Sequence, residues 1–184
     1  MSAAPGQTVG PFFHLGLPYE RGHELVPPGR ADAIRLHGRV FDGSGVPVPD
    51  AMIEIWQPGP DGQVLQEPGS IRRDGWTFTG FGRAATDPEG HYWFSTLEPG
   101  PSSPGKPAFF AVAVFARGLL DRLFTRAYLS DPQGADALLD SVAADRRDTL
   151  IATRDDVGYV FDIHLQGPKE TVFLSFPRHR GIWA

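Results

Sequence analysis

The chain has 184 residues, a formal net charge of −5 and no cysteine. Its length suits one domain with a substantial core, and its mildly acidic charge offers no basic surface for nucleic acid. The lack of thiols excludes disulfides and thiolate metal sites, and no run of about 18 apolar residues predicts a membrane helix. The first residues lack the basic and apolar regions of a secretory leader, so we expect a cytoplasmic protein.

Residues 1–33 are rich in proline, glycine and mixed polar residues. We interpret them as an extended N-terminal arm, followed by a single β-sandwich domain over residues 34–184. Phe12, Phe13 and Leu15 would be costly to leave in water, so we expect the arm to lie against a surface. A disordered tail is the alternative interpretation.

From Ile34 to Phe41, apolar and polar residues alternate, which predicts a strand with one buried face. The run 108–116 is short, continuously apolar and rich in β-branched residues, so we expect a strand buried on both faces. Turn sequences separate the other predicted strands, which cover residues 51–56, 80–86, 91–97, 124–129, 159–166 and 171–176.

One helix is predicted over residues 135–148, where Leu138, Leu139, Val142 and Ala143 would share a face. The 22 glycines and 18 prolines favour short elements joined by turns. The sequence therefore predicts an all-β sandwich with an extended arm and one or two short helices.

Several segments of the sequence resemble the intradiol ring-cleavage dioxygenases. The similarity covers nearly the whole chain, from about Gln7 to Phe176. Its core segments are Gly38-Arg39-Val40-Phe41-Asp42, Val48-Pro49-Asp50-Ala51, Ile53-Glu54-Ile55-Trp56-Gln57, Gly82-Arg83-Ala84-Ala85-Thr86-Asp87, Gly90-His91-Tyr92-Trp93-Phe94 and Pro99-Gly100-Pro101. The arm motif at 7–13 and the segments 115–118, 125–128, 159–163 and 170–174 are similar to the alpha subunits of the protocatechuate 3,4-dioxygenases in particular.

The resemblance implies a non-haem ferric ion held by two tyrosines and two histidines, which are ligands that suit this hard cation. The four corresponding positions here are Val64, Ser102, Phe109 and Ala111. Valine, phenylalanine and alanine side chains have no lone pair, and one serine hydroxyl alone cannot hold the metal. We therefore expect a vestigial site with no catalytic residue in this chain, and Fe(III) bound by a homologous beta subunit.

The same resemblance implies an alpha–beta hetero-oligomer in which this chain lines part of the iron-site cavity of the partner beta subunit. Thr8, Gly10, Pro11 and Arg117 are the residues that it assigns to substrate binding. Arg117 would bind the ring carboxylate of protocatechuate, Thr8 would form one hydrogen bond, and Pro11 would be an apolar wall beside a turn at Gly10. The complete enzyme would use dioxygen to form 3-carboxy-cis,cis-muconate. A surface arginine and a mere packing arm are the alternative interpretations.

Two other functions compete with this one. The middle segments also resemble transthyretin-like or carboxypeptidase-regulatory-like β-sandwich modules, which bind without catalysing, but such modules leave the arm and the segments after residue 115 unexplained. A self-sufficient intradiol enzyme for catechol or hydroxyquinol would need the metal ligands that this chain lacks.

Overall fold

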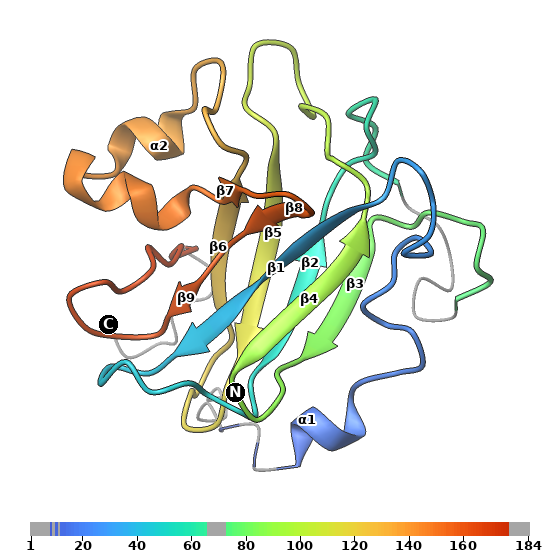
Figure 1. Ribbon diagram of the computed structural model, residues 1–184. Coiled ribbons are helices and arrows are strands. Elements are labelled where there is room, and N and C mark those ends of the chain that lie inside the picture. The colour runs from blue at the N-terminus through green and yellow to red at the C-terminus, as the bar shows by residue number, and fades with distance from the viewer. Residues whose placement is uncertain (1–7, 9, 11, 66–72, 177–184) are drawn as a thin grey trace, which may run out of the picture.

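The computed structural model describes residues 8, 10, 12–65 and 73–176 of the chain. This part is built mostly of strands in two sheets, with a few short helices at the periphery (Figure 1). The first sheet has the order β4-β1-β8-β7, with β9 also paired to β1, and the second has the order β3-β2-β5-β6. The expectation of a mainly β chain with few short helices is confirmed.

The predicted strand boundaries agree well with the structure where apolar and polar residues alternate. The first sheet contains β1 (Ile34–Phe41), β4 (His91–Thr96), β7 (Thr153–Arg154), β8 (Gly158–Val160) and β9 (Ile163–His164). The second contains β2 (Met52–Trp56), β3 (Phe81–Ala85), β5 (Phe109–Phe115) and β6 (Leu123–Tyr128).

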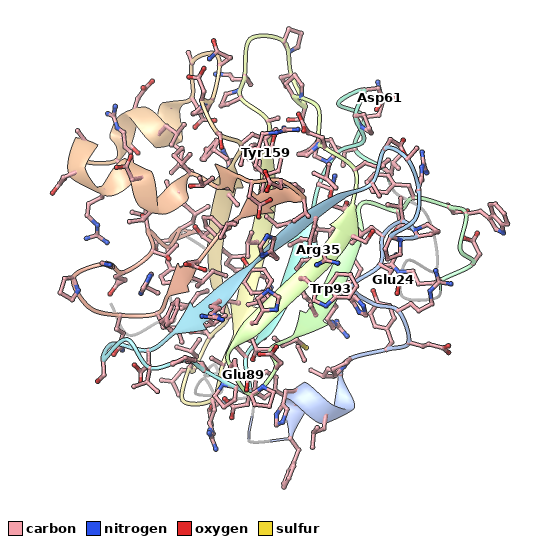
Figure 2. The ribbon with its side chains drawn as sticks, viewed as in Figure 1. Glu24, Arg35, Asp61, Glu89, Trp93 and Tyr159 are labelled. Atoms are coloured by element: carbon pink, nitrogen blue, oxygen red, sulfur yellow. The ribbon has the colours of Figure 1, made fainter. Side chains whose placement is uncertain are left out.

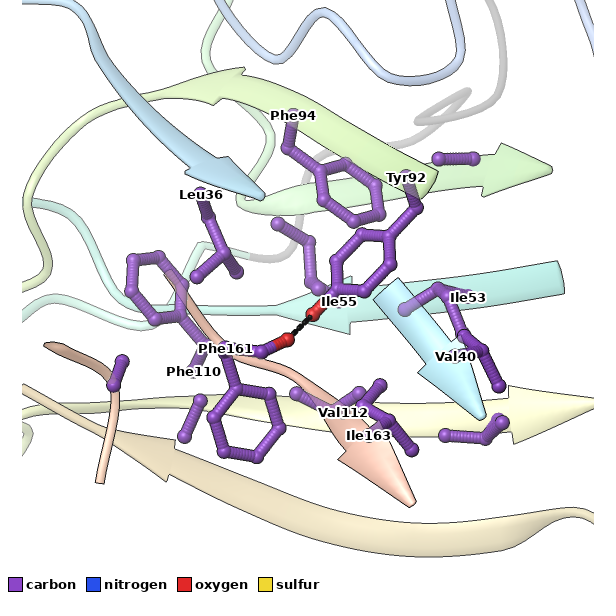
Figure 3. Close-up of a cluster of buried hydrophobic side chains, with 14 of the residues drawn as sticks. Leu36, Val40, Ile53, Ile55, Tyr92, Phe94, Phe110, Val112, Phe161 and Ile163 are labelled. Carbon is purple, nitrogen blue, oxygen red and sulfur yellow. Dashed lines mark hydrogen bonds between the residues drawn. The ribbon is translucent and has the colours of Figure 1, made fainter. Parts of the chain in front are cut away.

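The hydrophobic core lies between the two sheets (Figure 3). Because successive side chains of a strand point to opposite faces, alternate residues of the longer strands enter this core. The first sheet contributes Leu36, Val40, Tyr92 and Phe94, and the second contributes Ile53, Ile55, Phe110 and Val112. The buried Tyr92 hydroxyl donates a hydrogen bond to the Phe161 carbonyl (Figure 3). Burial raises the pKa of Tyr92 well above its usual value, which keeps the phenol protonated as a donor.

Strand β1 is in close contact with the chain between β8 and β9. A Cβ atom at Gly38 would lie 2.1 Å from the Phe161 carbonyl oxygen. The Phe161 N–H donates to the His37 carbonyl at 2.7 Å, and the Asp162 side chain accepts from the Arg39 N–H at 2.9 Å. At this point the Arg39 N–H binds the Asp162 side chain instead of a backbone carbonyl. The strand predicted over 159–166 is therefore divided into β8 and β9.

The helix predicted over 135–148 is interrupted. It forms α2 (Ala137–Ser141) and the 3-10 helix η1 (Ala144–Leu150). Asp136 caps α2 by accepting hydrogen bonds from the Leu138 and Leu139 N–H groups. The extended ψ angles of Val142 and Ala143, 134° and 138°, end the helix and leave Ala143 exposed, so the predicted apolar face was wrong.

Two strand predictions were also wrong in part. Strand β5 is not buried on both faces, because Phe109, Ala111 and Phe115 are only partly buried. The described residues 171–176 form no strand beyond a single bridge between Leu174 and Phe124. The segment divides its backbone bonds between two elements: the Thr171 N–H donates to His164 and the Leu174 N–H donates to Phe124.

The N-terminal region packs against the first and second sheets over part of its length. The Leu25 N–H donates to the Ser95 carbonyl at 2.8 Å, and Leu25 and Val26 are buried. Helix α1 (Phe13–Gly16) buries Phe13, but Phe12 and Leu15 stay 73% and 69% exposed. Within the described part of the chain, these two side chains therefore lack the cover that we expected.

Within the described ranges, no helix is long and apolar enough to cross a membrane. The C-terminal residues 178–184, which lie beyond the family similarity, are outside the described residues.

We predict that Gly38→Ala destabilises the fold by about 1–3 kcal/mol, since the added methyl group would overlap the backbone of Phe161. The matched control is Gly29→Ala, because no atom lies within 4 Å of the Cβ position at Gly29. Urea unfolding of both variants measures the difference. Equal unfolding midpoints would contradict the close contact at Gly38.

Candidate functional site

The structure brings Thr8 and Arg117 together. Strand β5 ends at Phe115, and the chain then turns through Gly118, which has a φ of 91°. The Gly118 N–H donates to the Thr8 hydroxyl at 3.3 Å, so the arm lies beside the residue that follows Arg117. Gly10 has a φ of 72°, a left-handed conformation that favours glycine and turns the arm. Pro11 lies outside the described residues.

An ion pair positions the Arg117 side chain. Its Nε atom lies 2.9 Å from Oδ2 of Asp50, whose side chain is only 10% exposed, whereas that of Arg117 is 62% exposed. The two residues meet because Asp50 precedes β2 and Arg117 follows β5, and these strands are antiparallel neighbours. Nε is the guanidinium nitrogen nearest to the side-chain stem, and pairing there leaves the N–H donors of the two terminal nitrogens available to other partners.

The sequence analysis assigned no function to Asp50. The only sequence feature that marks it is its place in Val48-Pro49-Asp50-Ala51, just before a strand. Its role depends on a contact between residues far apart in the chain. In the structure its carboxylate restrains the Arg117 side chain through the ion pair.

The residues at the four expected metal-ligand positions do not fit a ferric ion. Val64 and Ser102 lie exposed on two loops that touch, as a Cβ at Gly62 would lie 2.2 Å from the Pro101 carbonyl. Phe109 and Ala111 share the outer face of β5. The Ser102 hydroxyl is the one donor atom in this set of side chains. Among the described residues, no group of three or more His, Cys, Asp or Glu side chains could hold a metal.

The tyrosine closest to this region is also unsuited to bind ferric iron. Tyr128 packs against Phe109 with 5.4 Å between ring centroids, and its hydroxyl contacts Arg126 and Asp136. Burial is the main cause that raises the pKa of Tyr128 to about 12, with smaller opposing effects from Arg126. A phenolate ligand must be ionised, whereas this side chain stays a neutral phenol at ordinary pH.

A pair of histidines forms on the outer face of the first sheet, which their sequence spacing did not reveal. The rings of His37 and His91 lie 5.8 Å apart on the paired strands β1 and β4. His37 Nε2 lies 2.9 Å from the Asp155 carboxylate. Nearby, the Arg35 guanidinium lies 4.8 Å from the centre of the Trp93 ring (Figure 2). These contacts belong to a polar sheet surface, and in the described part of the chain these side chains are not arranged as a group that could hold a metal.

Comparison with known proteins establishes the family. The chain is 37% identical to the protocatechuate 3,4-dioxygenase alpha chain of Burkholderia cepacia, over 95% of this chain and 98% of that one. Residues 10–167 match the dioxygenase family. The chain belongs to the intradiol dioxygenase family. The beta chain of the Burkholderia cepacia enzyme is also similar, at 31% identity over 76% of this chain and 67% of that one.

The fold agrees with this membership of the intradiol dioxygenases. The dioxygenase domain of a carbohydrate-binding fusion protein from Streptomyces sp. SirexAA-E superimposes with a TM-score of 0.54 at 20% identity, over 89% of this chain and 97% of that one. Intradiol dioxygenases depend on non-haem iron. This member of the family therefore keeps the fold, while its residues at the expected ligand positions cannot bind the metal.

We predict that Tyr128→Phe removes an ionisation with a pKa of about 12 from the ultraviolet absorbance titration of the folded chain. Because burial raises this pKa above its value of 10.0 in the unfolded chain, the neutral phenol favours the fold below pH 10. That contribution is lost as the pH rises through about 12. Tyr159→Phe is the comparison variant, since burial also raises the pKa of Tyr159 above its usual value. The prediction would be contradicted if Tyr128→Phe removed from the titration a phenol with the ordinary tyrosine pKa.

Proposed function

We propose that this chain is the iron-free alpha subunit of a protocatechuate 3,4-dioxygenase and completes the active site of an iron-bearing beta subunit. One observation carries the proposal: the similarity to an alpha chain extends over 95% of the sequence, while all four ligand positions hold residues that do not fit iron. The core between two sheets supports the sandwich type of fold expected for this family. The complete enzyme would cleave protocatechuate with dioxygen between its two hydroxyl-bearing carbons.

Arg117 would supply the positive charge that protocatechuate requires. Its side chain is largely exposed, so its terminal nitrogens can reach a carboxylate held by another chain. Asp50 holds the Nε end of the guanidinium, which reduces the conformational freedom that binding would otherwise remove.

The arm would add a second contact at the same place. Thr8 is exposed and accepts a hydrogen bond from Gly118, so it lies beside Arg117 before any partner binds. Its hydroxyl can still donate one hydrogen bond, which suits a phenolic or carboxylate oxygen.

The first experiment compares the chain alone with the chain co-expressed with its iron-bearing homologue. Iron content and protocatechuate-dependent oxygen uptake are measured on both. We expect an iron-free, inactive chain alone and an iron-containing, active complex. Iron and activity in the isolated chain would overturn the subunit role, and the absence of any complex would favour a β-sandwich binding module.

A substitution tests the assigned role of Arg117 within the assembled complex. We expect Arg117→Ala to lower kcat/KM for protocatechuate about 10- to 150-fold, the effect of one charge-assisted contact, with iron content unchanged. The kcat/KM of Arg117→Lys should lie between those of Arg117→Ala and the unmodified complex, since lysine keeps the charge but lacks the planar guanidinium group. The matched control is Arg154→Ala, because Arg154 is 58% exposed and also pairs with a carboxylate, that of Glu98. Unchanged kinetics for Arg117→Ala would remove Arg117 from the site.

A further inference from the structure

Asp50 and Arg117 face one another because of the register of the second sheet. Strands β2 and β5 are antiparallel neighbours, and Met52 pairs with Phe115. If this register is continued by two residues, Asp50 lies opposite Arg117, just beyond the last paired residues. Opposite charges at directly opposed positions attract, and here Nε and Oδ2 lie 2.9 Å apart. The strand register therefore brings the two side chains together.

The two members of this ion pair have different surroundings. Asp50 is buried, with 7% of the residue exposed, whereas the Arg117 side chain is 62% exposed. A long exposed side chain samples many rotamers, and a short buried one samples few. The carboxylate is thus the fixed member of the pair, and the guanidinium takes its orientation from it.

A buried hydroxyl fixes the backbone on both sides of Asp50. The Ala51 N–H donates to the Thr86 hydroxyl at 2.9 Å, and this hydroxyl donates to the Val48 carbonyl at 2.8 Å. The Thr86 N–H in turn donates to the Ala51 carbonyl at 2.9 Å. Thr86 is itself buried, and a buried hydroxyl that loses its partners is costly, so the bridge across Asp50 resists movement.

The segment before Asp50 is also fixed to the first sheet. The Val48 N–H donates to the Val40 carbonyl of β1 at 2.9 Å. The ring of Pro49 then restricts φ of the residue that joins Val48 to Asp50. Asp50 therefore belongs to a segment that is held by both sheets, although it lies outside the regular strands.

We propose that Asp50 is a positioning residue, supported by Thr86, that gives Arg117 its selectivity for ligands with a carboxylate. The inference rests on the proposed function, since Arg117 must face the cavity of the iron-bearing chain. Because Asp50 binds Nε, the terminal nitrogens are left to bind the ligand. A positive charge attracts any anion, whereas a guanidinium of fixed orientation also selects a planar carboxylate by its geometry.

The negative charge of Asp50 has an opposing effect on the same ligand. It weakens the attraction between Arg117 and a carboxylate. At a guanidinium that is 62% exposed, water and salt screen this repulsion. The restraint on the arginine side chain is not screened in this way. We therefore expect the loss of restraint to outweigh the relief of repulsion when Asp50 is replaced.

The test measures ligand affinity of the assembled complex in the absence of dioxygen. The two ligands are protocatechuate and catechol, of which only the first carries a carboxylate. We expect Asp50→Asn to weaken the binding of protocatechuate about 2- to 12-fold, the effect of freeing one long side chain, and to leave the affinity for catechol unchanged. A merely structural role would weaken both ligands equally. In an Arg117→Ala background, Asp50→Asn should have no further effect on protocatechuate, because it acts through Arg117.

Two substitutions of Thr86 test its supporting role. Thr86→Val removes the hydroxyl but keeps the shape, and we expect it to weaken protocatechuate binding without affecting catechol. Thr86→Ser keeps the hydroxyl and should bind protocatechuate more tightly than Thr86→Val. The matched control is Glu98→Gln, which removes a carboxylate that also lies 2.9 Å from an exposed arginine, Arg154, and should change the affinity for neither ligand.

A measurement on the chain alone tests the ion pair without the partner. The NMR signal of the Arg117 Nε–H group is assigned by its loss in Arg117→Lys. Its exchange with water should be at least about 10-fold faster in Asp50→Asn, because one charge-assisted contact is weakened. Equal exchange rates would show that Asp50 does not hold the guanidinium.

The proposal is also overturned if Asp50→Asn binds protocatechuate as tightly as the unmodified complex or more tightly, or if it loses affinity for catechol to the same extent. Failure of the proposed function gives a different result. In that case no complex forms, or Arg117→Ala leaves protocatechuate binding unchanged. Slow exchange of Arg117 Nε–H would then report a structural ion pair only, and the proposal would end with the function on which it rests.

Discussion

The fold depends above all on the close packing of backbone around β1. This strand pairs with β4 on one side and with β8 and β9 on the other, so it links the N-terminal and C-terminal parts of the chain. The absence of a side chain at Gly38 lets the Phe161 backbone approach, and the Tyr92 hydroxyl binds the same carbonyl from the core. With this part of the core fixed, the inner face of the second sheet packs against the residues that β1 and β4 supply.

The two faces of the second sheet have different uses. Its inner face supplies Ile53, Ile55 and Val112 to the core, and alternate positions on the same strands face outward. The partly buried Phe109 and Ala111 occupy outer positions of β5, so side chains at these positions can differ while the inner face keeps the core residues.

The sequence predicted the regular strands well, because alternation reports directly on a buried face. The strand prediction failed where tertiary contacts replace backbone pairing. At Asp162, for example, the side-chain carboxylate accepts the Arg39 N–H in place of a backbone carbonyl of a paired strand. The helix prediction failed at Val142, where apolar spacing continues although the backbone is extended. Family resemblance, and not residue spacing, predicted that Thr8 lies near Arg117. Neither of them predicted the ion pair between Arg117 and Asp50, since it joins the ends of two separate strands.

The exposure of Phe12 and Leu15 has a consequence for protein homeostasis. Phe12, which precedes α1, and Leu15 within it are 73% and 69% exposed, so they present an apolar surface on any copy that remains unassembled. Surplus copies would be bound by chaperones or degraded, and their lifetime would fall as their concentration exceeds that of a subunit able to cover them.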